Sequence, residues 1–178
     1  MAGKRKSNPD PGCYPTPGRS GITPRNRPLE RIVSGGQTGV DRAALDFARA
    51  CGIPHGGWCP RGRRAEDGPI DSGYALRETP EPDYSQRTEW NVRDSDGTVI
   101  FTISPELTGG SALTRDLALA CGRPCLHLSQ TRDDRAGDRL REFIRRHAIK
   151  VLNVAGPRRS TEPRAGEFAR RVLDQLLE

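Results

Sequence analysis

The run RIVSGGQTGVDRAALDFARACG, residues 31–52, contains the pattern that decides the fold. Its first positions are apolar and β-branched, its middle holds three glycines within five residues, and its last part has apolar residues at helical spacing. The three glycines are Gly35, Gly36 and Gly39. This order indicates a strand that turns sharply into a helix, and Gly52 stands where the C-cap of that helix belongs.

Apolar runs and helical patterns alternate along the rest of the chain. Further strands are predicted within 53–58, 98–104, 124–129 and 150–157. Helices are predicted within 85–97, 106–122, 133–148 and 166–178. The segment 60–86 has no clear period and holds four prolines, which predicts a long irregular loop. Strand–helix alternation predicts an α/β domain at 29–178, with three α/β/α layers and a mainly parallel sheet.

The positive charge is concentrated at the N-terminus. Residues 1–28 carry a net charge of +5, and residues 29–178 carry only +1 of the total of +6. This tail is rich in proline and glycine and has no apolar run, which predicts disorder. The near-neutral domain does not favour nucleic-acid binding, so any weak contact with nucleic acid is expected through the tail.

The cysteine pattern favours a reduced, cytoplasmic protein. There are five cysteines, an odd number, and the sequence lacks the apolar core of a secretory signal. No apolar segment is long enough to span a membrane. The run CGRPCLH, residues 121–127, lacks a second matching pair and has the wrong spacing for zinc, so no metal site is predicted.

Three glycine-containing turns are expected at one edge of the sheet, because parallel strands all end on the same side. They are SGGQTGVD (34–41), LTGGSALT (107–114) and NVAGPRRS (153–160), and the third contributes Gly156. The helix after such a turn presents unpaired N–H groups, which suit a phosphate. Hydrogen-bonding and cationic side chains accompany the glycines: Ser34, Gln37, Thr38, Ser111, Thr114, Arg158 and Arg159. The alternative is that the glycines serve strand-to-helix packing alone.

Two further features leave both a structural and a functional interpretation open. Asp41 lies in the first turn of its helix, where it favours the dipole; in a ligand site it would accept a hydrogen bond. Arg87, Asn91 and Asp94 form a polar stripe on the helix within 85–97, either solvated or facing a ligand. The loop 60–86 would then act as a lid; otherwise it is an exposed loop.

Together these motifs resemble the family called "putative molybdenum carrier", the circularly permuted YpsA-like branch of the SLOG superfamily. The resemblance runs collinearly from residue 29 to 178. It implies a Rossmann-like fold and a ligand site for a phosphate-bearing small molecule, either nucleotide-derived or molybdenum cofactor. The binding residues that it implies are Gly35, Gly36, Gln37, Thr38, Gly39, Asp41, Gly109, Gly110, Ser111 and Thr114, with Arg158 and Ser160 in addition.

A more distant resemblance leaves an enzymatic alternative. The cytokinin-activating phosphoribohydrolases carry PGGxGTxxE, where this chain has TGGSALTRD, residues 108–116. Asp116 stands in place of the catalytic glutamate, so the alternative function is hydrolysis of nucleoside monophosphates with Asp116 or Asp41 as the acid or base. The apolar residues of the last helix predict either a homo-oligomer contact or packing into the core; they are Phe168, Val172 and Leu176.

Overall fold

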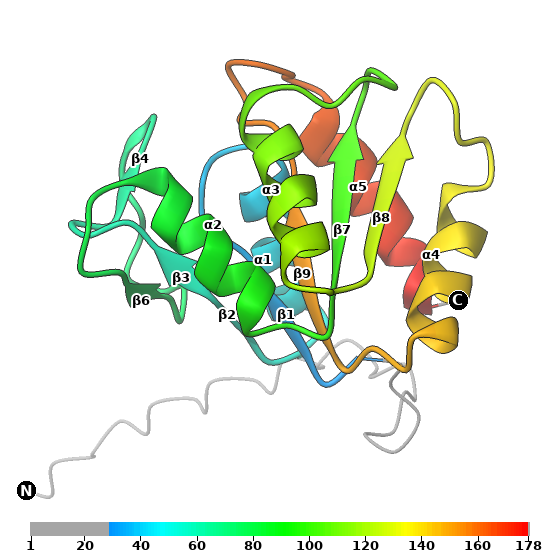
Figure 1. Ribbon diagram of the computed structural model, residues 1–178, viewed down its shortest axis with the longest axis horizontal. Helices are drawn as coiled ribbons and strands as arrows, with labels where there is room; N and C mark the ends of the chain where they lie inside the picture. The colour runs from blue at the N-terminus through cyan, green and yellow to red at the C-terminus, as the bar shows by residue number, and fades with distance from the viewer. Residues whose placement is uncertain (1–28, 178) are drawn as a thin grey trace, which may run out of the picture.

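Five parallel strands form the centre of the computed structural model, which describes residues 29–177 (Figure 1). The strand order is β2-β1-β9-β7-β8, and every pair is parallel. The strands are β1 Arg31–Val33, β2 His55–Gly56, β7 Gly97–Thr102, β8 Cys125–Ser129 and β9 Val151–Ala155. The parallel sheet predicted from the sequence is therefore confirmed. The tail predicted to be disordered, residues 1–28, lies outside the described residues.

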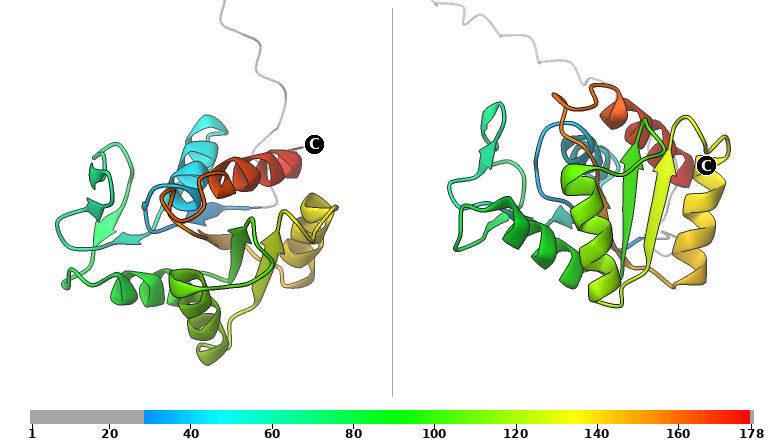
Figure 2. Two further views of the ribbon diagram at one scale, coloured as in Figure 1. Left: turned by 90° about the horizontal axis from the view of Figure 1, so that it is seen from above. Right: turned by 45° about the horizontal axis from the view of Figure 1, so that its top comes forward.

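Helices cover both faces of the sheet, as the predicted three-layer arrangement requires. They are α1 Val40–Ala50, α2 Tyr84–Arg93, α3 Gly109–Ala120, α4 Ala136–Arg146 and α5 Ala165–Asp174, with a short 3₁₀ turn η2 at Gln175–Leu177. Figure 2 shows α1 and α5 on one side of the sheet, and α2 and α3 on the other. All six residues of β7 are buried, which explains its continuous apolar sequence.

The main apolar core lies between the sheet and the layer of α1, α4 and α5. Phe101 of β7 meets Phe168 of α5 edge to face, with 5.7 Å between the ring centroids. Phe168 and Val172 are buried, and Leu176 packs against the same cluster. Of the two interpretations of the last helix, packing into the core is the one that the structure shows.

The segment predicted as an irregular loop, together with the two residues before it, contains two small strand pairs. β3 (Trp58–Cys59) pairs with β6 (Arg77–Glu78) in parallel, and β4 (Arg64–Ala65) forms an antiparallel hairpin with β5 (Gly68–Pro69). The guanidinium of Arg63 donates hydrogen bonds to four backbone carbonyls between residues 70 and 76. Trp58 lies at the end of the strand predicted within 53–58. The other two-residue strands show no period in the sequence, which is why they were not predicted.

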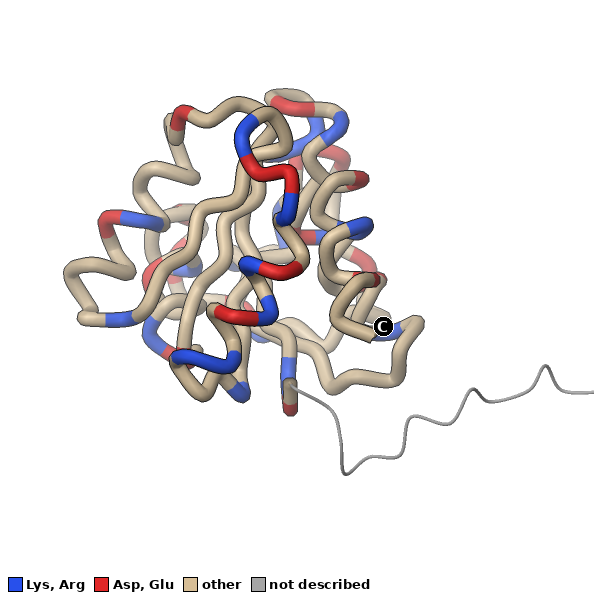
Figure 3. Tube along the Cα trace, turned by 90° about the vertical axis from the view of Figure 1, so that its right-hand side faces the viewer, with Lys and Arg blue, Asp and Glu red and all other residues tan. Residues whose placement is uncertain are grey.

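Charges of both signs are mixed on the surface of the domain. Along α4, which faces the viewer in Figure 3, Arg141 pairs with Asp138 and Arg145 with Glu142. This mixture of charges agrees with the net charge of +1 that residues 29–178 carry. Across residues 29–177, no helix has the length and apolar character needed to cross a membrane.

The end of α4 provides a stability prediction. Ala148 has φ +50° in a C-terminal capping turn, in which its N–H donates to Arg145 O and the N–H of Ile149 donates to Ile144 O. Glycine adopts this conformation without the steric cost of a Cβ atom. We expect Ala148→Gly to raise the free energy of unfolding by about 0.5–1 kcal/mol in urea denaturation. Ala120→Gly, at the last residue of α3, should lower it instead; a loss at both positions would contradict the prediction.

Candidate functional site

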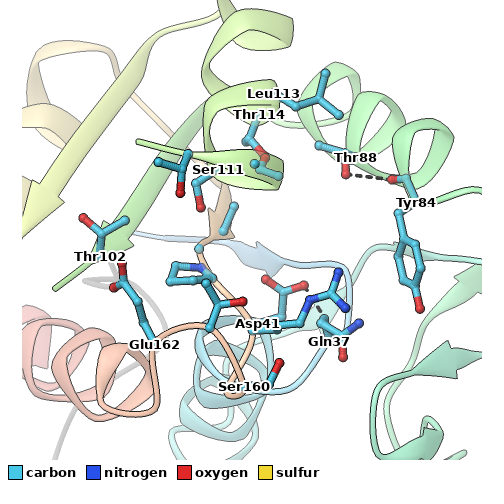
Figure 4. Close-up of a pocket in the computed structure, with 18 of the residues that line it drawn as sticks. Gln37, Asp41, Tyr84, Thr88, Thr102, Ser111, Leu113, Thr114, Ser160 and Glu162 are labelled. Atoms are coloured by element: carbon cyan, nitrogen blue, oxygen red, sulfur yellow. Dashed lines mark hydrogen bonds between the residues drawn. The ribbon is translucent and has the colours of Figure 1, made fainter. Parts of the chain in front are cut away.

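The strand order brings the three glycine-containing turns together. β9 lies between β1 and β7, so the turns that follow these strands are neighbours at the carboxyl edge of the sheet. They surround a cavity of about 380 Å³, which α2 also borders (Figure 4). Ten of the sixteen predicted ligand residues line it: Gln37, Asp41, Arg87, Gly109, Gly110, Ser111, Thr114, Gly156, Arg158 and Ser160. Ligands of open α/β sheets bind at this kind of edge.

The N-terminus of α3 opens onto the cavity. A Cβ atom at Gly109 or Gly110 would meet nothing within 4 Å, so a ligand can approach this backbone closely. The cap residue Thr108 makes no side-chain hydrogen bond to the helix. The first N–H groups of a helix lack intrahelical acceptors and carry a partial positive charge. This helix end is therefore suited to an oxyanion.

Two buried donors on the cavity wall have no acceptor among residues 29–177. Gln37 is only 6% exposed, and its Oε1 accepts from the N–H groups of Thr38 and Glu66, both at 3.0 Å. Its Nε2 is buried without a hydrogen-bond partner in this part of the chain, and the same holds for Nε of Arg87. Leaving a buried donor unpaired costs about 1–3 kcal/mol. Both residues line the cavity, which makes these two donors candidates for the acceptor oxygens of a ligand.

Asp41 lies at the bottom of the site and forms an ion pair with Arg87. Its Oδ2 is 3.2 Å from Arg87 Nη1 and accepts a hydrogen bond from the N–H of Gln37 at 3.2 Å. Burial raises the pKa of the Asp41 carboxyl, although the Arg87 guanidinium acts in the opposite direction. Asp41 thus lines the cavity, but its ion pair and its hydrogen bond are made with Arg87 and Gln37 of the protein itself.

Six of the predicted ligand residues do not line the cavity, and their contacts hold the surrounding structure together. Ser34 donates to Val154 O at 2.7 Å, which joins the end of β1 to β9. Asn91 bonds both the N–H and the carbonyl of Trp58, so this part of the α2 stripe faces β3 and not the cavity. Thr38 donates to the Glu66 carboxylate.

The other three predicted ligand residues that do not line the cavity are the glycines of the first turn. Neighbouring atoms of the protein lie too close to them for a side chain. A Cβ atom at Gly35 would overlap the Arg87 guanidinium, one at Gly36 would meet Leu76, and one at Gly39 would meet the backbone of the third turn. In the first turn, the glycines therefore serve close packing. The backbone that is open to a ligand is the one at the start of α3.

The two candidate acids of the enzymatic alternative are in different places. Asp116 is on the outer side of α3, where it pairs with Arg115 at 2.7 Å and its side chain is 59% exposed. It does not line the cavity, whereas Asp41 does. In the described part of the chain, no cluster of His, Cys, Asp or Glu has the arrangement of a metal site.

Several cavity residues were not predicted as ligand residues from the sequence. Thr102 and Glu162 lie together at one end, away from Gln37 and Asp41 (Figure 4), and Tyr84 and Thr88 come from α2. The N–H of Ile103 donates to the Glu162 carboxylate at 2.5 Å. Of the segment considered as a lid, only residue 84 lines the cavity, while the β4–β5 hairpin contacts the first and third turns.

These features define a Rossmann-like α/β protein with a cavity at the carboxyl edge of its sheet. The model of the circularly permutated YpsA SLOG family matches residues 32–177, and the chain belongs to this family. A crystal structure of a protein named "Putative molybdenum carrier protein", from Syntrophus aciditrophicus SB, is 45% identical with a TM-score of 0.83, and the match covers 85% of this chain and 97% of that chain. No curated protein matches the chain.

Proposed function

We propose that the protein binds a phosphate-bearing small molecule, nucleotide-derived or of the molybdopterin type, in this cavity and acts as its carrier. The observation that carries the proposal is the pair of buried, unmatched donors, Gln37 Nε2 and Arg87 Nε, among the described residues that line the cavity. The similar protein from Syntrophus aciditrophicus SB bears the name of a molybdenum carrier, which supports the carrier class.

The other walls of the cavity suit the two parts of such a ligand. The open helix start at Gly109 and Gly110 supports phosphate binding there. The ring of Tyr84 lies 5.9 Å from the Arg87 guanidinium carbon and 5.8 Å from that of Arg158. This ring and the half-exposed Leu113 offer apolar surface for a flat heterocycle.

The alternative function, hydrolysis of a nucleoside monophosphate, depends on Asp41. A buried carboxyl with a raised pKa can serve as a general acid. The carrier function is favoured because Asp41 is already engaged by Arg87 and by the backbone of Gln37. Incubation with a panel of nucleoside monophosphates distinguishes the two, since only the enzyme releases free base.

The direct test is native mass spectrometry of the protein purified from its host, combined with calorimetric titration of AMP, GMP and the matching nucleosides. We expect a bound phosphorylated compound, and binding of at least one nucleotide but not of its nucleoside. Equal affinity for nucleotide and nucleoside would contradict the proposal, because the phosphate would then contribute nothing.

Arg158 and its neighbour Arg159 provide a matched comparison. Only Arg158 lines the cavity. We expect Arg158→Gln to weaken binding of the phosphorylated ligand by about 10- to 100-fold, as the loss of one charge-assisted hydrogen bond does. Arg159→Gln should leave the dissociation constant within about twofold, because Arg159 does not line the cavity. Equal losses in the two variants would show that general charge, and not this site, holds the ligand.

A further inference from the structure

The tip of the β4–β5 hairpin is fastened to two of the three turns that border the cavity. The carboxylate of Glu66 accepts hydrogen bonds from the hydroxyl groups of Thr38 and Ser160, and from the N–H of Ser160 at 3.2 Å. Thr38 belongs to the first turn and Ser160 to the third, and Ser160 lines the cavity. One side chain of the hairpin therefore joins two turns that are far apart in the sequence.

An ion pair also holds the same hairpin. Arg42 of α1 pairs with both oxygens of Asp67, at 2.9 and 3.0 Å, and its Nε donates to Gly36 O at 3.0 Å. The hairpin is thus fixed at two successive residues, Glu66 and Asp67, so the backbone between them has a defined position over the first turn.

The position of the hairpin tip decides how the side-chain amide of Gln37 is oriented. The N–H of Glu66 and the N–H of Thr38 both donate to Gln37 Oε1 at 3.0 Å. Two N–H donors cannot be satisfied by an NH₂ group, so the amide oxygen must face them. The Nε2 atom is left as the buried, unmatched donor among the described residues. A rotated amide would present an oxygen, which repels an anion.

We propose that Glu66 is a positioning residue that sets the selectivity of the site for acceptor oxygens. Its carboxylate fixes the hairpin tip, and the backbone N–H of Glu66 then holds Gln37 Oε1. Only Nε2 of the Gln37 amide is left to bind a ligand. This proposal rests on the proposed function for its ligand, a phosphate ester. It adds that recognition depends on a residue outside the cavity wall. Glu66 acts through Gln37, and its carboxylate acts by holding the hairpin tip in place.

The test combines Glu66→Ala with Gln37→Met, which keeps the length of the side chain but removes the amide, and measures AMP binding by calorimetry. We expect each single variant to lose about tenfold in affinity, and the double variant to lose no more than Gln37→Met alone. Glu81→Ala removes a carboxylate of the same segment that does not line the cavity; this control variant should bind as the wild type does.

A readout without ligand separates this proposal from the proposed function. The side-chain NH₂ resonances of Gln37, identified by their loss in Gln37→Met, should exchange slowly in the wild type and faster in Glu66→Ala. If these resonances are unchanged in Glu66→Ala, or if the two affinity losses multiply, the positioning role is wrong. If they change but AMP and GMP do not bind to the wild type, the positioning of the amide stands and the proposed function fails for these ligands.

Discussion

Gly39→Ala is expected to lower the free energy of unfolding by about 3–5 kcal/mol. Gly39 precedes α1 with φ +82° and ψ −125°, a conformation that side-chain-bearing residues rarely adopt. The added Cβ would also lie 2.7 Å from Pro157 O and 2.9 Å from Arg159 N. Both are backbone atoms of the third turn, so the new methyl group can be accommodated only if the two turns separate.

Gly68→Ala separates the two causes of this loss. Gly68 also has a positive φ, +111°, but a Cβ atom there would meet nothing within 4 Å. This variant should lose only the conformational part, about 1–3 kcal/mol. Urea denaturation of the wild type and both variants gives the comparison. Equal losses would mean that the close approach of the first and third turns contributes nothing to stability.

Arg87→Met is expected to lower the free energy of unfolding by about 3 kcal/mol at pH 8. Arg87 and Asp41 have side chains that are only 16% and 3% exposed, so the substitution leaves a buried carboxylate without its cation. Arg93→Met is the control, because Arg93 and Asp94 form an exposed pair that should contribute less than about 1 kcal/mol.

The pH dependence of this variant follows from Asp41. Burial raises the pKa of Asp41 in the folded protein above the ordinary value of 3.8, whereas the charge of Arg87 lowers it. Removal of Arg87 therefore raises the pKa of Asp41 further. A carboxyl group whose pKa is raised in the folded state lowers the free energy of unfolding by its full amount at pH values above that pKa. This cost disappears as the pH falls towards the pKa of the carboxyl in the unfolded chain. The deficit of Arg87→Met should therefore shrink as the pH falls from 8 towards the ordinary carboxyl value of 3.8. Adding Asp41→Asn should recover most of it, and a deficit independent of pH would refute the assignment.

Much of the fold could be predicted because its cause is local. The buried strand β7 is apolar at successive positions since both its faces are covered, and the helices α1 and α3 carry their spacing and their C-terminal glycines in the sequence. The strand pairs between residues 58 and 78 could not be predicted in this way. The loop between β5 and β6 is held by Arg63, whose guanidinium makes contacts that no periodicity reveals.

For the candidate site, the sequence indicated the correct edge of the sheet but not the role of each residue. Glycine at a strand end permits either close packing or ligand approach, and only the neighbours of Gly39 and Gly110 distinguish the two. Glu162 and Tyr84 have no motif around them, and they reach the cavity because of where their helices and loops lie. Gln37 was identified as a candidate, but its buried amide nitrogen is visible only in three dimensions.

The place of β9 also has a consequence for synthesis of the protein. This strand, residues 151–155, comes after the other four strands of the sheet and joins the β2–β1 pair to the β7–β8 pair. On the ribosome, both pairs emerge before the strand that unites them, and each exposes an open edge until then. The five-stranded sheet can therefore assemble only after residues 151–155 have emerged, and nascent chains stalled before this strand should depend on chaperones to remain unaggregated.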